Sequence, residues 1–290
     1  MRIQHNITAL NSHRNLTNNN SSLTKNLEKL SSGYRINRAG DDAAGLAISE
    51  KMRAQITGLS TAQKNAEDGV SLVQTAEGAL TEVHSMLNRM VELATQSANG
   101  TYSTANRTEM QKEIKALGAE IDRIGKTANF NGITLFAGGK TSGTAKSITL
   151  HVGESSSTDN QIKISLSKMS ASFLGVSASH AGQGSAAGAT KLSITTAAKA
   201  RMAISTINKA IDFISSMRSD FGALQNRLEH TINNLGVQNE NISAAESRIR
   251  DVDMAKEMMA YTKNNILVQA SQAMLAQANQ VPQGVLQLLQ

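Results

Sequence analysis

The stretch that decides the fold is ARMAISTINKAIDFISSMRSDFGALQNRLEHTINNLGVQNENISAAESRI, residues 200–249, where an apolar residue returns at every seventh position. That repeat consists of Ala200, Ile207, Ile214, Phe221, Leu228, Leu235, Ile242 and Ile249. A second repeat of the same period runs through Met52, Leu59, Ala66, Val73, Leu80, Leu87 and Ala94. A sustained seven-residue apolar repeat is typical of helices that pack side by side along a seam. We therefore expect a mainly α-helical chain whose two halves form a long antiparallel rod or coiled coil.

Residues that typically begin or end a helix flank both repeats. The first long helix should run over about 43–97, capped by Asp41 or Asp42, and the second should run from Ser193 or Thr196 to about Arg250. A shorter helix should lie between them, with apolar residues at Met110, Ile114, Leu117, Ile121 and Ile124. Three glycines interrupt the first long helix, and close packing against a neighbouring helix would explain them: Gly58, Gly69 and Gly78.

The middle of the chain changes to a period of two. Apolar residues alternate at Ile148, Leu150 and Val152, and again at Ile162, Ile164 and Leu166. Residues 153–160 supply the turn, so this region predicts a small β-hairpin. The Asn131-Gly132 pair between apolar residues predicts a second tight turn. Residues 175–190 are rich in Gly, Ala, Ser and Gln and should form a loop.

Both chain ends are amphipathic, and the polar face of residues 1–35 is rich in Asn and Ser, which are poor helix formers. The apolar positions near the start are Ile3, Ile7, Leu10, Leu16, Leu23, Leu27, Leu30 and Tyr34, with a phase slip after Leu10. Those near the end are Val252, Met259, Ile266, Ala270 and Met274, followed after an expected break at Pro282 by Val285, Leu286, Leu288 and Leu289. The last leucines form an apolar tip that needs a partner.

Composition excludes several classes of function. Cysteine is absent, and the six histidines include no pair four residues apart, so disulfides, thiol catalysis and the two-histidine zinc motif are excluded. Adjacent carboxylates at Asp41-Asp42 suit helix capping better than acid catalysis. We therefore predict no catalytic, cofactor or metal site, and no enzyme.

Charge and hydropathy argue against two further kinds of partner. The net charge is +6 and the pI about 9.5, but the basic residues are scattered among acids and no aromatic residues interleave with them. A DNA-compacting coiled coil remains an alternative, and it would require salt-sensitive DNA binding. No stretch approaches the roughly 18 apolar residues of a membrane span, and the first twenty residues lack a secretory apolar run.

The ends are too poor in apolar groups to fold alone. Burying a Leu or Ile side chain contributes about 1.5–3 kcal/mol, whereas ordering each residue costs about 1–2 kcal/mol. Residues 1–35 hold only eight or nine large apolar groups. We expect the ends to fold when packed among other copies, in contacts that repeat without closing; the alternative is an ordinary intramolecular helix pair. The predicted polymerisation residues are Ile3, Ile7, Leu10, Leu23, Leu27, Leu30, Ile249, Val252, Met259, Ile266, Val285, Leu288 and Leu289.

Three segments carry a resemblance to a known family. Residues 30–48, LSSGYRINRAGDDAAGLAI, closely resemble the N-terminal signature of bacterial flagellins, with Tyr34 where Leu is more usual. SRIRDVDMA at 247–255 and QVPQ at 280–283 resemble the C-terminal signature. The resemblance implies a filament subunit with a terminal coiled-coil polymerisation domain at 1–42 and 250–290. It further implies a helical rod domain with β-hairpins at 43–174 and 191–249, and a remnant of a variable region at 175–190.

The same resemblance implies partners and a location. Copies of the chain would form a helical homopolymer in the extracellular flagellum, after export through the flagellum's own channel without a cleaved signal peptide. An export chaperone, the filament cap and hook-junction proteins would be further partners; a hook–filament junction protein is the alternative function. LNRMVEL at 87–93 resembles the stretch recognised by an animal Toll-like receptor, with Arg89, Leu93 and Glu113 at matching positions and Val91 where a second Arg is common.

Overall fold

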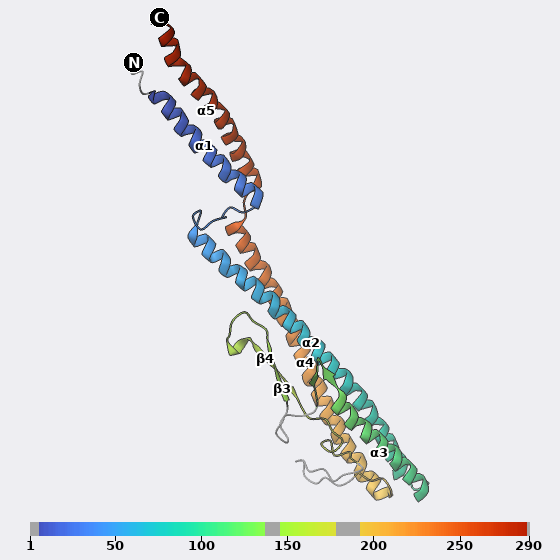
Figure 1. Cartoon of the computed structure of the whole chain (residues 1–290). Helices are drawn as coiled ribbons and strands as arrows, with labels where there is room; N and C mark the ends of the chain where they lie inside the picture. Colours follow the sequence, from blue (N-terminus) through green and yellow to red (C-terminus); the bar gives the residue numbers. More distant parts are fainter. Residues whose placement is uncertain (1–5, 137–145, 178–191, 289–290) are drawn as a thin grey trace. The chain divides into compact units, whose positions relative to one another are not determined.

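The computed structural model describes residues 6–136, 146–177 and 192–288 (Figure 1). The chain forms two compact units: a terminal unit of residues 1–57 and 239–290, and a central unit of residues 58–238. The helices are α1 (Ile7–Ser32), α2 (Ala43–Ala98), α3 (Thr104–Thr127), α4 (Ala197–Arg250) and α5 (Met254–Leu288). The strands are β1 (Asn129–Phe130), β2 (Ile133–Thr134), β3 (Lys146–His151) and β4 (Gln161–Leu166). The predicted mainly α fold with a small β region is confirmed.

The core of the central unit lies along the two predicted apolar repeats. The repeat residues of α2 that are buried are Leu59, Ala66, Val73, Leu80, Leu87 and Ala94. Those of α4 are Ala200, Ile207, Ile214, Phe221, Leu228 and Leu235. Helix α3 adds Ile114 and Ile121, which are fully buried in the same cluster. The seven-residue period therefore marks a real packing seam in this unit.

Two hairpins lie between α3 and α4. Strands β3 and β4 pair antiparallel with Ile148 opposite Ile164, and β4 alternates exposed and buried side chains, as its period of two predicts. A short 3-10 helix, η1 (Thr158–Asn160), lies in the connection. Strands β1 and β2 are joined by Asn131 and Gly132, whose φ angles of 49° and 76° suit a tight hairpin turn.

The three glycines that were expected to pack against a neighbouring helix have different surroundings. A Cβ at Gly69 would collide with Leu150 of β3 and lie 3.5 Å from Leu228 of α4, and one at Gly58 would lie 3.3 Å from Glu154 in the β3–β4 connection. A Cβ at Gly78 would meet nothing within 4 Å. The expectation of close packing against a neighbouring helix therefore fits Gly69 alone, and Gly58 and Gly69 both make room for the β3–β4 hairpin.

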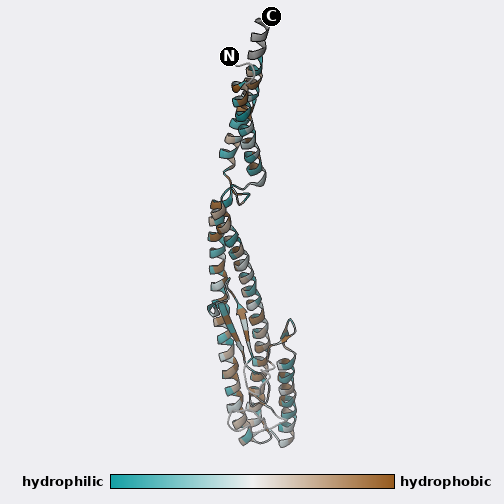
Figure 2. Ribbon diagram, turned by 60° about the vertical axis from the view of Figure 1, so that its left-hand side comes forward, coloured by the Kyte–Doolittle hydropathy of each residue, from teal (hydrophilic) through white to brown (hydrophobic). Residues whose placement is uncertain are grey.

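Helices α1 and α5 pair antiparallel in the terminal unit, and Figure 2 shows apolar and polar residues mixed along both. The predicted break at Pro282 is wrong, because α5 is helical from Met254 to Leu288. Proline has no N–H, so the carbonyl four residues earlier, that of Ala278, loses its usual helical donor. The side-chain amide of Asn6 donates to that carbonyl at 2.8 Å. The Asn6 amide thus supplies the Ala278 carbonyl with the donor that the helix lacks at this position.

Candidate assembly surface

The faces that α1 and α5 turn toward each other alternate between apolar and polar layers. Seven half-buried residues of α1 are spaced by threes and fours: Ala9, Ser12, Leu16, Asn19, Leu23, Asn26 and Leu30. Those of α5 include Glu257, Tyr261, Asn264, Val268, Ser271, Leu275 and Ala278. Asn19 donates to the Ser271 hydroxyl at 3.0 Å, which fixes how the two faces align. Leu23 and Leu30 therefore lie in the seam between the two helices.

Five of the other predicted polymerisation residues are more than half exposed, while Ile249 and Val252 are half-buried. On α1, Ile7, Leu10 and Leu27 are 61%, 64% and 53% exposed. On α5, Met259 and Ile266 are 68% and 60% exposed. No residue of α1 is buried. Ile3 and Leu289 lie outside the described residues, as do the side chains of Val285 and Leu288. The helix pair thus presents large apolar side chains on its outer surface, which is typical of an interaction site.

The N-terminal and C-terminal signature segments meet next to this pair. Gly33, with φ at +75°, ends α1, and its carbonyl accepts from the N–H of Val252 at 3.0 Å. The N–H of Arg35 donates to the Arg250 carbonyl at 2.6 Å, and Tyr34 forms a single antiparallel bridge with Asp251. The clip made by residues 33–35 and 250–252 therefore joins the two chain ends by backbone hydrogen bonds.

The Arg250 side chain strengthens the clip in a way that sequence reasoning missed. Its guanidinium carbon lies 4.7 Å from the centroid of the Tyr34 ring, and Nη1 lies 2.9 Å from a Glu50 carboxylate oxygen. The side chain is only 14% exposed, so this cation–π contact and ion pair are partly desolvated. Tyr34, the departure from the usual Leu, supplies the ring.

Asp41 and Asp42 hold the start of α2. An Asp42 carboxylate oxygen accepts from the N–H of Gly45 at 2.9 Å, which is helix capping as predicted. Asp41 accepts from the N–H groups of Arg38 and Asn37 at 3.1 and 3.2 Å. These bonds, that from Arg38 first, lower the pKa of the Asp41 carboxyl. Both carboxylates are occupied by backbone groups and serve the turn.

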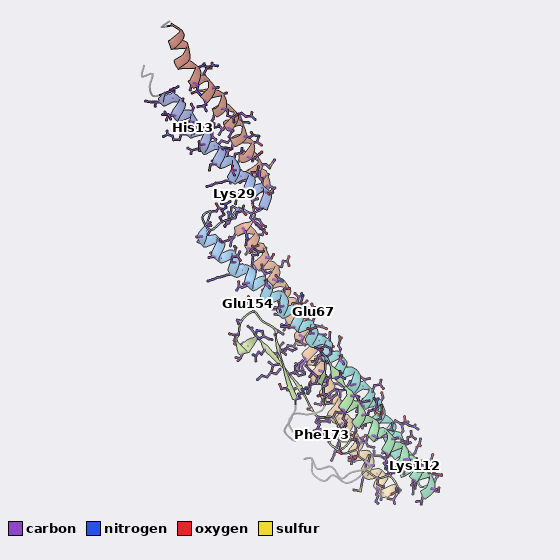
Figure 3. All side chains as sticks on the ribbon, viewed as in Figure 1. His13, Lys29, Glu67, Lys112, Glu154 and Phe173 are labelled. Carbon is purple, nitrogen blue, oxygen red and sulfur yellow. The ribbon has the colours of Figure 1, made fainter. Side chains whose placement is uncertain are left out.

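The structure brings together two of the three predicted receptor residues. Arg89 of α2 donates to Glu113 of α3 at 2.9 Å and to Glu92 at 2.9 Å, on the exposed surface. The hydrogen bond to Glu113 is the first cause of the raised pKa of Arg89. Leu93 is 2% exposed and packs in the core, so only Arg89 and Glu113 present their side chains outward. Lys112, labelled in Figure 3, pairs with Glu109 nearby on α3.

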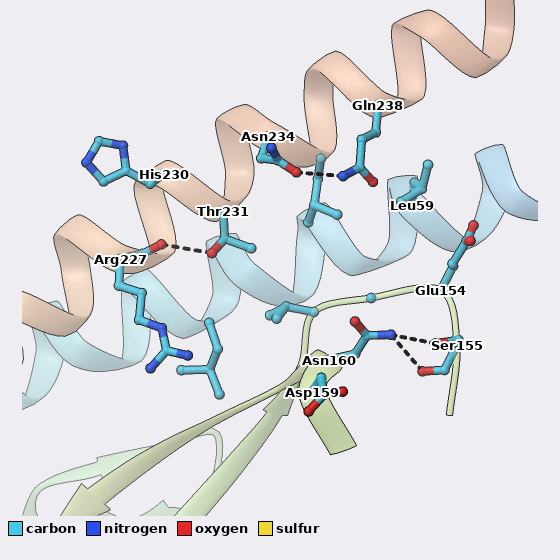
Figure 4. Close-up of a pocket in the computed structure, with 14 residues that line it drawn as sticks. Leu59, Glu154, Ser155, Asp159, Asn160, Arg227, His230, Thr231, Asn234 and Gln238 are labelled. Carbon is cyan, nitrogen blue, oxygen red and sulfur yellow. Dashed lines mark hydrogen bonds between the residues drawn. The ribbon is translucent and has the colours of Figure 1, made fainter. Parts of the chain in front are cut away.

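An open cleft of about 790 Å³ lies between the β3–β4 connection and α4 (Figure 4). Several of its polar side chains bond to neighbours on their own segments. Gln238 donates to Asn234 at 2.6 Å, and Asn160 donates to the Ser155 hydroxyl at 2.7 Å. Among the described residues, no three His, Asp or Glu side chains lie close enough to hold a metal ion. No described helix combines the length and apolar character of a membrane span.

Comparison with known proteins agrees with this arrangement. The family model of the bacterial flagellin N-terminal helical region matches residues 3–141, and that of the C-terminal helical region matches residues 204–289. The chain is 52% identical to the flagellin of Bacillus subtilis strain 168, over 100% of both chains. It is 50% identical to the flagellar filament 33 kDa core protein of Treponema phagedenis, again over 100% of both.

One solved structure supports the fold. A candidate flagellar hook-associated protein from Vibrio parahaemolyticus superposes with a TM-score of 0.57, covering 73% of this chain and 100% of that one. At 14% identity this likeness concerns the fold alone, so it does not favour the hook–filament alternative over the full-length matches to flagellins. Two family models at the helical ends and about half-identical relatives along the whole chain establish that this protein is a member of the bacterial flagellin family, a family of structural proteins and not of enzymes.

Proposed function

We propose that this chain is a structural subunit that polymerises into the bacterial flagellar filament for motility. The observation that carries the proposal is the outer surface of the α1–α5 pair, where Ile7, Leu10, Leu27, Met259 and Ile266 are each more than half exposed. Such side chains gain about 1.5–3 kcal/mol each when a neighbouring copy covers them. A contact between different faces of successive copies repeats without closing and so builds a helical filament.

Folding of the chain ends is coupled to assembly in this proposal. No side chain of α1 is buried in the single chain, so the free energy gained by burial offsets little of the entropy cost of ordering its 26 residues. Neighbouring copies supply the missing burial. Residues 1–42 and 250–290 then act as the polymerisation domain, and residues 43–174 and 191–249 as the next layer of the filament. Residues 175–190, most of which lie outside the described residues, are assigned to a remnant of a variable region.

Export and the other partners follow from family membership. The subunit leaves the cell through the flagellum's own channel without a cleaved signal peptide. An export chaperone, the filament cap and hook-junction proteins bind its ends on the way. The apolar surface of the α1–α5 pair supports these assignments, because each such partner would have to cover it before or during assembly.

The substitution Leu27→Asp tests the proposal. Leu27 is 53% exposed, so a carboxylate is solvated in the free chain but desolvated between copies, and filaments should fail to form. Electron microscopy scores filaments, and circular dichroism should show that the helices within 45–250 are kept. The matched control is Thr24→Asp, one turn earlier at an exposed polar position, which should still assemble. A general loss of helix in Leu27→Asp would instead favour an ordinary intramolecular pair.

Recognition by an animal Toll-like receptor is a second proposal, supported by the exposed ion pair of Arg89 with Glu113. Purified monomer should activate receptor-bearing reporter cells, and Arg89→Ala should be about tenfold less potent, as for an interface anchor. Lys112→Ala, which removes a neighbouring exposed cation on α3, serves as the control and should leave potency unchanged. Silence of the unsubstituted monomer at high dose would discard this proposal and leave the filament function untouched.

A further inference from the structure

We propose that a ladder of asparagines on α1 sets the register of the terminal helix pair. The ladder consists of Asn6, Asn19 and Asn26, each of which bonds across the seam to α5. This inference deepens the proposed function, because the pair on which assembly rests must be aligned before its outer apolar side chains can meet those of other copies. The role is one of positioning, and the ladder need not contact another copy.

Each rung is a specific hydrogen bond. Asn19 donates to the Ser271 hydroxyl at 3.0 Å. In the amide orientation that satisfies its neighbours, Asn26 donates to a Glu257 carboxylate oxygen at 3.0 Å and accepts from the Asn264 amide at 3.0 Å. All three asparagines of the ladder are half-buried, so a rung without its partner would leave a partly desolvated amide unpaired.

The rung at Asn6 depends on Pro282. Its amide nitrogen donates to the Ala278 carbonyl at 2.8 Å, the carbonyl that proline leaves without a helical donor. The oxygen of the same amide caps α1 by accepting from the N–H of Ala9 at 3.2 Å. One side chain therefore ties the start of α1 to a single position near the end of α5, because the other carbonyls of the α5 interior already have helical donors.

The apolar layers alone could not choose this alignment. The Asn19–Ser271 and Asn26–Asn264 bonds imply that the apolar layers between the rungs align Leu16, Leu23 and Leu30 with Leu275, Val268 and Tyr261. If every layer were apolar, a slip of three or four residues would still bring apolar side chains together. With the ladder present, the same slip places asparagine amides against leucine or valine. A polar layer in a helix pair selects register in this way, at a cost in stability.

The experiment reads the register with introduced cysteines, which are the only thiols because the chain has none. One full-length variant carries Leu16→Cys with Leu275→Cys, the aligned pair. A second carries Leu16→Cys with Ala278→Cys, a pair offset by three residues that keeps every rung, because Ala278 takes part only through its backbone carbonyl. Disulfide formation requires Cα atoms within about 7 Å, so each product reports one alignment. The crosslinked chain is scored on gels as monomer-sized, intramolecular product, in assembled filaments and in free chain.

With the ladder intact, the aligned product should exceed the offset product about tenfold or more, because a shift in register would leave a partly buried amide without a hydrogen-bond partner. The ladder is then removed in both reporters by Asn6→Asp, Asn19→Leu, Asn26→Leu, Asn264→Leu and Ser271→Leu. Asn6→Asp keeps the oxygen that caps α1 but has no N–H to donate to the Ala278 carbonyl. Both products should now form in comparable amounts, although the helices become more stable. The control places leucines outside the seam, with Asn18→Leu, Asn20→Leu and Gln272→Leu, and should keep the aligned product dominant.

Two outcomes overturn the inference: a leucine variant that still gives the aligned product alone, or an intact ladder that gives both products equally. Electron microscopy of the same samples reports filaments separately. Absence of filaments from the unsubstituted chain would count against the proposed function, while the crosslinks of the free chain would still decide the register.

Discussion

Glycine positions show how much a single missing methyl group can decide. A Cβ at Gly125 of α3 would lie 2.1 Å from the Met169 carbonyl oxygen, which belongs to backbone and cannot move aside cheaply. A Cβ at Gly78 of α2 would meet nothing within 4 Å, although both glycines lie within helices. Glycine in a helix costs about 1 kcal/mol relative to alanine, so the two sites should respond in opposite directions to the same substitution.

We predict that Gly78→Ala stabilises the central unit by about 0.5–1 kcal/mol. Gly125→Ala should destabilise it by about 1–3 kcal/mol, because the backbone near Met169 must shift to admit the methyl group. Thermal unfolding followed by circular dichroism measures both changes against the unsubstituted chain. Equal stabilisation of the two variants would show that the contact at Gly125 is not tight.

Single residues also mark the limit of what the sequence predicts. The capping role of Asp42 was predictable, because a carboxylate just before a helix has a local partner in the next turn. The contact of Arg250 with Tyr34 and Glu50 was not, because it joins residues about 200 positions apart. Asn19 and Asn26 did carry a signal. They share the seven-residue spacing of the apolar repeats, but a polar repeat reads as a solvated face until its partner helix is known.

At the scale of helices, the burial of the apolar repeats of α2 and α4 was predictable from the sequence. The direction in which the apolar side chains of the terminal helices point was not. In the central unit every seventh residue is buried inside one chain, so the pattern and its partner belong to the same molecule. In α5, Met259 and Ile266 follow the predicted stripe, yet they point to solvent while Val268 and Ser271 face α1. An amphipathic pattern reveals an apolar face but not what covers it.

The stripe of α5 gives an element-scale prediction. Met259→Gln combined with Ile266→Gln should abolish filament formation while leaving the helix content of the free chain unchanged. The reason is that side chains that are 68% and 60% exposed contribute little to the single chain and much to contacts between copies. Sedimentation measures the assembled fraction. The control, Thr262→Gln with Lys263→Gln on exposed polar positions between them, should assemble normally. Assembly by the double apolar variant would place the contact on another face.

On the scale of the whole chain, the two units differ in how their stability arises. Among the described residues, every buried apolar side chain except that of Ile36 belongs to the central unit. The terminal unit relies on half-buried seam residues, polar rungs and the clip at residues 33–35 and 250–252. Regions with few buried apolar contacts open at a lower free energy than the core of a domain. The central unit is therefore stable by itself, whereas the stability of the chain ends depends on neighbouring copies.

This division predicts two separate steps when the monomer is heated. The first, at low temperature, should remove the marginal helix that α1 and α5 hold without neighbouring copies, and the second should unfold the central unit. Assembly should merge the first step into a later transition, because copies that bind only the folded ends stabilise them by mass action. Calorimetry of monomer and filament measures both, and limited proteolysis locates the first step, which should expose residues 6–32 and 254–288 while sparing 58–136. If the monomer instead melted in one step, with its ends as resistant to protease as its centre, the free chain would already hold its ends folded and neighbours would add only contact.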